Sequence, residues 1–164
     1  MKVITNLTSA HTFLKPGSAI AIGNYDGVHF GHQAILKQLT TYAKAHKLRS
    51  VLLTFDPHPA NILAPRAGLH RINTLDQKLE LLAKTGLDGV IIQPFDKKFA
   101  HVKPKDFFEK ILIKKLHAQF VIVGHDFTFG ARRQGTTETL EKLGRLHHIA
   151  VRLVDAQTHH GVLV

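Results

Sequence analysis

The sequence predicts an α/β fold, with a parallel sheet of about five strands and helices on both faces. Short apolar runs alternate with amphipathic stretches along the chain, and several of the runs end at Gly or Pro. No internal repeat or low-complexity tract interrupts this order, and 164 residues suit a single domain. Because strands that alternate with helices of about 10–15 residues form βαβ units, the sheet should be parallel.

The predicted strands are continuous apolar runs, as expected for strands buried on both faces. They cover residues 19–23, 51–55, 89–93, 120–123 and 151–154. The second run is followed by Asp-Pro-His-Pro. Its two prolines exclude a helix and further ladder pairing, so residues 56–59 should form a rigid loop at the carboxyl end of a strand.

The predicted helices carry apolar residues at helical spacing. The first covers residues 32–47, and the second begins at a capping box formed by Thr74 and Gln77 and ends near Gly86. Pro104 suits the first turn of a third helix. A fourth begins at residue 136 or 137 and reaches about residue 146.

In a sheet of this kind, ligands bind beyond the carboxyl ends of the strands, where the strand order reverses. The segments 23–32, 56–59, 94–99 and 124–135 each follow a predicted strand. We therefore expect these four loops to lie along one edge of the sheet and to face one cleft.

The segment 23–32, GNYDGVHFGH, has the most distinctive chemistry. Its glycines allow backbone N–H groups to approach a ligand closely, and the helix N-terminus that follows favours an anion. His29 and His32 frame that terminus; both can donate hydrogen bonds to phosphate oxygens, and both can carry charge near neutral pH. The alternatives are that the imidazoles only cap the chain or lie in solvent. A zinc site is a weaker alternative, because no carboxylate pattern accompanies the two histidines.

Composition narrows the class of partner. The chain has 22 Lys+Arg, 12 Asp+Glu and a net charge of +10, which suits a polyanion, but the charges occur as scattered pairs and no nucleic-acid recognition motif is present. There is no cysteine, which excludes disulfides, Cys-ligated metals and cysteine nucleophiles. No apolar stretch approaches about 20 residues and no signal-peptide pattern occurs, so we expect a cytoplasmic protein with no membrane partner. The oligomeric state is left open.

GNYDGVHFGH resembles the nucleotidyltransferase signature of the bacterial bifunctional FAD synthetases (riboflavin kinase/FMN adenylyltransferases). Further stretches fit the same family in order: LLTFDPHPANIL, LHRINTLDQKLELLAKTGLDGVIIQPFDKKFA, KDFFEKILIKKLHAQFVIVGHDFTFG and ARRQG. The TFDPHP and VGHDFTFG blocks make the resemblance specific to the flavin branch. Tyr25 stands where this family usually has Phe.

The resemblance implies a Rossmann-like nucleotidyltransferase fold and the transfer of AMP from ATP to the phosphate of FMN, which gives FAD and pyrophosphate. His29 and His32 would be catalytic, and Mg²⁺ would accompany ATP. The ATP-binding residues would be Gly23, Asn24, Asp26, Gly27 and Gly31. The flavin and adenine cleft would be lined by Phe55, Pro57, His58, Pro59, Gly124, Asp126 and Phe127. By residue type alone, Asp26 and Asp126 could instead stabilise turns, and Phe127 and Phe129 could belong to the core.

Family members continue from the segment after Asp155 into a Ser-Ser/Thr-x-Arg-Ile-Arg stretch that serves the ATP phosphates, and then into a riboflavin kinase domain. This chain reads AQTHHGVLV after Asp155. We therefore expect residues 1–164 to be an adenylyltransferase domain cut before that stretch, either as part of a longer protein or as a shortened homologue. Without the arginine, adenylylation by this chain alone would be weak. The alternative function is a non-catalytic nucleotide- or flavin-binding homologue.

Overall fold

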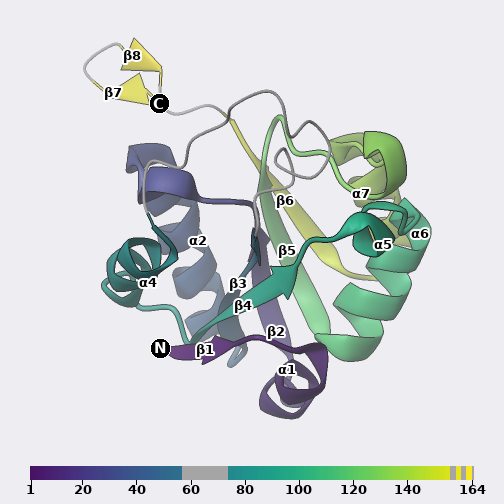
Figure 1. Ribbon diagram of the computed structural model, residues 1–164, viewed down its shortest axis with the longest axis horizontal. Coiled ribbons are helices and arrows are strands. Elements are labelled where there is room, and N and C mark those ends of the chain that lie inside the picture. The colour runs from purple at the N-terminus through teal and green to yellow at the C-terminus, as the bar shows by residue number, and fades with distance from the viewer. Residues whose placement is uncertain (57–73, 156–157, 160–161, 164) are drawn as a thin grey trace.

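Six parallel strands form the central sheet, in the order β1-β4-β3-β2-β5-β6 (Figure 1). The computed structural model describes residues 1–56, 74–155, 158–159 and 162–163. The strands of this sheet are β1 (Lys2–Ile4), β2 (Ser18–Ile22), β3 (Arg49–Asp56), β4 (Gly89–Pro94), β5 (Ala118–Gly124) and β6 (Ala150–Val154). A separate antiparallel pair joins β7 (Thr158–His159) to β8 (Val162–Leu163). The predicted parallel α/β architecture is confirmed.

The edge strand β1 was not predicted. It has three residues, of which only Ile4 is buried, so it lacks the continuous apolar run that identifies the other strands in the sequence. It forms because its backbone pairs with β4, in the register Lys2 to Gly89. Pairing across 87 positions of sequence is a tertiary event, which local periodicity does not encode.

The helices cover both faces of the sheet. They are α1 (Leu7–Phe13), α2 (Phe30–Ala45), α4 (Leu75–Ala83), α5 (Lys97–Ala100), α6 (Pro104–Asp106) and α7 (Thr137–Leu146), with short turns η1 (Asp26–Val28) and η4 (Ala131–Arg133) and the π-helical segment η3 (Phe107–Lys115). The capping box of Thr74 and Gln77 is present. Helix α2 starts two residues before the predicted residue 32, because the side chain of His29 caps it. Helix α5 lies in a segment expected to be a loop; it starts where Asp96 accepts the N–H of Phe99 at 2.7 Å.

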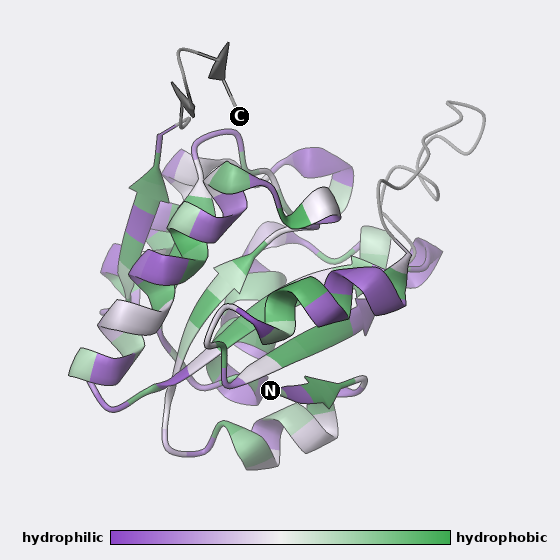
Figure 2. Cartoon of the chain, turned by 90° about the vertical axis from the view of Figure 1, so that its left-hand side faces the viewer, coloured by the Kyte–Doolittle hydropathy of each residue, from purple (hydrophilic) through white to green (hydrophobic). Residues whose placement is uncertain are grey.

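Alternation along the strands divides the core into two layers. In β2, Ile20 and Ile22 pack with η3 and α7 on one face, and Ala19 and Ala21 pack with α2 and α4 on the other. Figure 2 shows the apolar strands between helices of mixed hydropathy. Both faces are therefore buried, which explains why the predicted strands are apolar runs rather than alternating ones.

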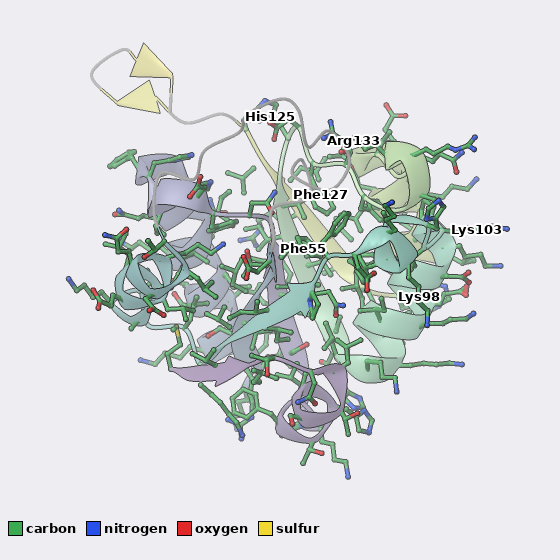
Figure 3. All side chains as sticks on the ribbon, in the orientation of Figure 1. Phe55, Lys98, Lys103, His125, Phe127 and Arg133 are labelled. Carbon is green, nitrogen blue, oxygen red and sulfur yellow. The ribbon has the colours of Figure 1, made fainter. Side chains whose placement is uncertain are left out.

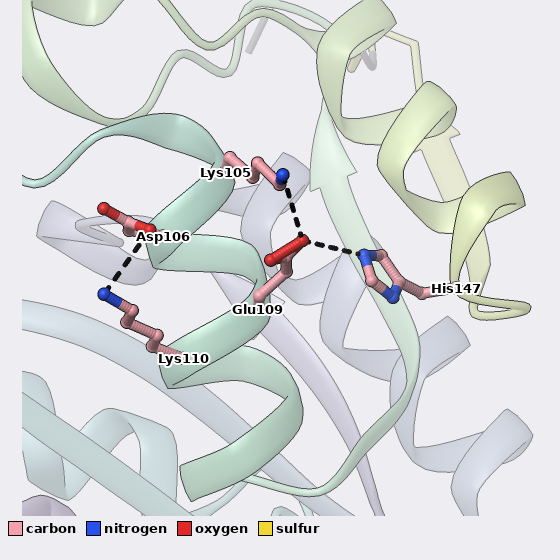
Figure 4. Close-up of polar contacts among 5 residues, drawn as sticks. All are labelled: Lys105, Asp106, Glu109, Lys110 and His147. Atoms are coloured by element: carbon pink, nitrogen blue, oxygen red, sulfur yellow. Dashed lines mark ion pairs between the residues drawn. The ribbon is translucent and has the colours of Figure 1, made fainter.

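Segment η3 is held on the sheet by burial more than by charge. The Glu109 carboxylate lies 3.9 Å from Lys105 Nζ and 3.3 Å from Nε2 of His147, the C-cap of the neighbouring α7 (Figure 4). Lys105 is exposed, and an ion pair with an exposed partner contributes at most about 1 kcal/mol, whereas Glu109 and His147 are both half-buried. Phe108 is fully buried and also contacts the ring of His147, so it contributes more.

The topology opens a crevice at the carboxyl ends of β2 and β5. From β2 the chain continues to β3 and β4 on one side, and it then crosses to β5 on the other side of β2. The loops after β2 and β5 therefore lead to helices on opposite faces, and they diverge at this point.

Among the described residues, no helix combines the length and the apolar character needed to cross a membrane.

Candidate functional site

A cleft of about 820 Å³ occupies this carboxyl edge. Its volume falls in the usual range for small-ligand sites. In Figure 3 the labelled side chains of His125, Arg133 and Phe127 lie in the upper part of the view, and Phe55 lies below them. The predicted site residues that line the cleft are Gly23, Asn24, Asp26, His29, Gly31, His32, Phe55, Gly124, Asp126 and Phe127. Gly27 lies in η1 and does not line the cleft, and Pro57, His58 and Pro59 lie outside the described residues.

The loop between β2 and α2 has a strained backbone. Tyr25 (φ 52°), Gly27 (φ 79°) and Val28 (φ 41°) lie in the left-handed region. Only glycine adopts it freely, and a β-branched residue such as Val28 is an outlier there. The Val28 N–H donates to the Tyr25 carbonyl at 3.2 Å, and Gln33 Nε2 donates to the Val28 carbonyl at 3.1 Å. Strain held in place by surrounding contacts is concentrated at functional sites.

The two histidines cap helix α2 reciprocally. His29 Nδ1 accepts the N–H groups of Gly31 (3.2 Å) and His32 (3.4 Å), and His32 Nδ1 accepts the N–H of His29 (3.3 Å). The two imidazoles stack with centroids 3.5 Å apart, and the Tyr25 ring stacks on the other side of His32 at 4.3 Å. Because both Nδ1 atoms accept, neither carries a proton, and each neutral ring bears its proton on Nε2.

Capping and ligand binding are therefore compatible at His29 and His32. The Nδ1 atoms are used by the helix, and the two side chains also line the cleft. Each neutral ring then has an Nε2–H donor that the capping box does not use. These donors lie at a helix N-terminus, where the dipole already favours a negative charge.

His32 is held neutral at physiological pH. Burial, the neighbouring His29 and Lys78 lower its pKa from 6.5 to about 4, and Asp26 and Asp126 oppose this change. The expectation that both imidazoles can carry charge near neutral pH is thus wrong for His32. The largest cause of the lowered pKa is desolvation, which disfavours the charged form of the imidazole. The sequence could not show this, because burial of the ring depends on how the loop folds back.

One wall of the cleft is aromatic. It is lined by Phe55, Phe95, Phe99, Phe107, Phe127 and Phe129. Phe127 stacks on Phe129 with centroids 5.6 Å apart and 11° between the ring planes, and Phe95 meets Phe99 edge-on at 5.6 Å. Phe129 belongs to the buried core, and the half-buried Phe127 packs against that core while lining the cleft. Phe129 therefore belongs to the core, as its residue type allowed, and both rings also face the cleft.

Several cleft residues were not singled out from the sequence. Phe95 and Phe99 lie in the segment 94–99, which was expected to face the cleft although neither residue was named, and Phe107 comes from η3, where only the clustering of phenylalanines would have indicated it. Arg133 is the one Lys or Arg among the described residues that line the cleft, which also contains His125, Asp26, Asp126 and Asp155. Arg133 lies next to a left-handed turn at Gly130, where a Cβ atom would come within 2.7 Å of Pro104.

The parallel sheet with helices on both faces and a cleft at its carboxyl edge defines a Rossmann-like α/β protein. A pantoate–β-alanine ligase from Francisella tularensis, complexed with β,γ-ATP and β-alanine, superimposes with a TM-score of 0.66 at 13% identity over 100% of this chain and 70% of that one. A structure described as a macrolide-efflux protein from Streptococcus pneumoniae gives a TM-score of 0.78 at 24% identity over 99% of this chain and 53% of that one. At such low identity these likenesses concern the fold alone.

The family follows from sequence comparison. A family model for FAD synthetase matches residues 12–164, and the chain belongs to the FAD synthetase family. The bifunctional riboflavin kinase/FMN adenylyltransferase of Escherichia coli K12 is 35% identical over 144 residues, which are 88% of this chain and 46% of that protein. The protein of the same name from Listeria monocytogenes is 36% identical over 142 residues, 85% of this chain and 44% of its own. The chain thus spans less than half the length of these relatives, and the resemblance found in its motifs is confirmed.

Proposed function

We propose that this chain transfers AMP from ATP to the phosphate of FMN, which yields FAD and pyrophosphate. The observation that carries the proposal is the pairing of two features in one cleft: the capped N-terminus of α2 and the wall of phenylalanines. The first suits phosphate groups and the second suits a planar aromatic ring. Membership of the FAD synthetase family supports the same reaction.

In the proposed reaction an oxygen of the FMN phosphate attacks the α-phosphorus of ATP. A new P–O bond forms, the bond from the α-phosphorus to the bridging oxygen breaks, and pyrophosphate leaves with that electron pair. A phosphate monoester has a second pKa of about 6 and is largely dianionic at pH 7, so the attack needs no protein base. The chain's task is to bring two anions together and to stabilise the leaving group.

His29 and His32 perform this task as neutral donors. Their Nε2–H groups and the first N–H groups of α2 would bind the phosphate oxygens of ATP. Because the capping box holds both rings before substrate arrives, no reorganisation is needed at the moment of reaction. Arg133 would add a permanent positive charge at the same cleft. The net charge of +10 would draw both anionic substrates toward the protein.

Magnesium fits this site as a companion of ATP rather than as a resident ion. Within residues 1–56 and 74–155, no group of three or more His, Cys, Asp or Glu side chains could hold a metal ion. Mg²⁺ is commonly bound through one or two carboxylates and the phosphates of its substrate. Asp26, Asp126 and Asp155 line the cleft and are the candidate carboxylates. When bound, the ion would neutralise part of the phosphate charge.

A cytoplasmic location, where ATP is available, is part of the same proposal.

The direct test is to incubate the protein with FMN, ATP and Mg²⁺ and to measure FAD by chromatography and pyrophosphate by a coupled assay. Both products should appear in equal amounts. The double variant His29→Asn/His32→Gln is the control, because it keeps a capping box and removes both Nε2–H donors. Binding of ATP without formation of either product would contradict the proposal and favour a non-catalytic nucleotide-binding homologue.

A further inference from the structure

Lys78 is a buried lysine in contact with the loop that carries the two histidines. It lies on α4 and is only 8% exposed. Its Nζ donates to the backbone carbonyl of Asn24 at 2.5 Å and to Thr54 Oγ1 at 2.9 Å, and Thr54 Oγ1 donates to the same carbonyl at 3.1 Å. Lysine is rarely buried to this extent, because its charge must be compensated by close polar contacts.

These three residues come from three elements and meet at one carbonyl. Asn24 follows β2, Thr54 belongs to β3, and Lys78 belongs to α4. The next residue, Tyr25, is the first of the left-handed positions. Because the carbonyl and the following N–H of a trans peptide point in opposite directions, two donors on the Asn24 carbonyl fix the orientation of the whole Asn24–Tyr25 peptide plane. The strained loop therefore starts from a fixed point.

The charge of Lys78 also reaches the histidine pair. It lowers the pKa of His32, together with burial and with His29. Asp26 of η1 and Asp126 after β5 act in the opposite direction. Lys78 also contacts the loop directly, through the hydrogen bond from its Nζ to the backbone carbonyl of Asn24.

We propose that Lys78 is a positioning residue of the site: it pins the Asn24 carbonyl and thereby holds residues 23–29 in the conformation that presents the start of α2 and the two imidazoles to the ligand. The identity of that ligand rests on the proposed function, whereas the effect on the loop does not. A purely structural lysine would instead anchor α4 to the sheet and leave the loop unchanged when it is removed.

The absence of cysteine from the chain permits a precise replacement of this one amine. Lys78→Cys introduces a single thiol. Alkylation with 2-bromoethylamine in denaturant, followed by refolding, converts it into S-aminoethylcysteine, which is lysine with sulfur in place of its γ-methylene. The matched control is Lys84→Cys, at the exposed end of the same helix, taken through the same steps. The unalkylated proteins pass through the same unfolding and refolding.

Two measurements on the ligand-free protein test the proposal independently of the reaction. In Lys78→Cys, the pKa of His32, followed by NMR, should rise from its value of about 4, and the amide of Val28 should exchange with solvent faster. Aminoethylation should reverse both changes, and Lys84→Cys should show neither. If Lys78→Cys melts at a lower temperature but keeps the His32 titration and the Val28 exchange unchanged, Lys78 only anchors α4 and the proposal is overturned.

Turnover gives the functional readout. A displaced loop should reduce kcat for FAD formation by about 100-fold in Lys78→Cys, and aminoethylation should restore most of it. If Lys78→Cys does not refold, Lys78→Met takes its place, because it keeps an unbranched apolar side chain and removes the ammonium donor of the Asn24 carbonyl. This variant should exchange the Val28 amide faster and raise the pKa of His32. Unchanged exchange in this variant would overturn the proposal.

Discussion

The imidazoles of His29 and His32 lie stacked, with centroids 3.5 Å apart, and the two side chains cap the backbone of the helix that they open. Each ring therefore uses Nδ1 as an acceptor and keeps the proton on Nε2. Protonation of either Nδ1 would remove one side of the capping box. The chemistry of the site and the stability of the first turn of α2 are thus coupled through the same two side chains.

His29→Asn separates the capping role of His29 from its proposed role in catalysis. Asparagine is among the best N-cap residues, so the melting temperature should change little, whereas the Nε2–H donor is lost. We expect kcat to fall by roughly 10²–10³, by analogy with the loss of one oxyanion-hole donor, with a smaller change in KM for ATP. Steady-state kinetics and thermal unfolding test this. An unchanged kcat would mean that the imidazole serves only as a cap.

The stability of the fold should decrease on acidification between about pH 6.5 and pH 4. The folded pKa of His32 is lowered from 6.5 to about 4, so in this range the unfolded chain binds the proton and the folded chain does not. The free energy of unfolding should drop by up to roughly 3 kcal/mol across it. Urea unfolding of the wild type and of His32→Gln measures the effect. The variant should depend less on pH, with a remaining slope from His117, whose pKa burial and the neighbouring His11 also lower. Identical slopes would show that His32 is not the titrating group.

Tyr25→Phe should stabilise the protein. The Tyr25 hydroxyl is buried and, within the described part of the chain, has no hydrogen-bond partner, which is an energetic cost. Removing it while keeping the ring on His32 should add about 1 kcal/mol, which corresponds to a rise of roughly 2–4 °C in melting temperature. This is the position where the family usually has Phe. A loss of kcat in this variant would instead indicate that the hydroxyl finds its partner in the ligand.

Arg133→Gln should weaken the binding of the anionic substrates. Loss of one charge-assisted hydrogen bond costs about 1.5–3 kcal/mol, so the Kd for ATP or FMN should rise roughly 10- to 100-fold, and its dependence on salt should decrease. Arg132→Gln is the matched control: it removes the same charge from the adjacent exposed residue, which also has a positive φ and does not line the cleft. Calorimetry at two salt concentrations provides the measurement. If both variants raised the Kd equally, Arg133 would act only through the net charge of the protein and not through a contact with the substrate.

Phe127→Ala should weaken the binding of FMN and leave the binding of ATP nearly unchanged. Its ring lines the cleft and stacks on Phe129, so it offers a flat apolar surface to an isoalloxazine. The KM for FMN should rise by about 10-fold or more, while that for ATP changes little. Phe13→Ala on α1, which also removes a partly buried ring and lies outside the cleft, controls for a general loss of stability. Equal increases for both substrates would argue against a flavin contact.

Local patterns were sufficient where an element depends on neighbouring residues. The buried strands appear as apolar runs, the capping box of Thr74 and Gln77 starts α4, and the N-cap at Thr136 starts α7. Helix α4 ends at Ala83, before the predicted end near Gly86. Elements that depend on distant contacts were missed. Strand β1 exists because it pairs with β4. The short α5 was also missed, although its cap is local: Asp96 accepts the N–H of Phe99, three residues further along the chain. The burial of Lys78 was weakly indicated by the sequence, because it lies three residues after Leu75 and four before Leu82, on the apolar side of α4.

The sequence by itself determined the fold class, the family and the loop that carries His29 and His32, because these are encoded by residue type and spacing along the chain. Only the tertiary structure decided the lowered pKa of His32, the aromatic wall that α5 and η3 complete, and the contact of Lys78 with Asn24. The physical reason is common to all three. A pKa depends on desolvation and on nearby charges, a cleft on rings from separate loops, and a pinned carbonyl on donors 30 and 54 residues away along the chain.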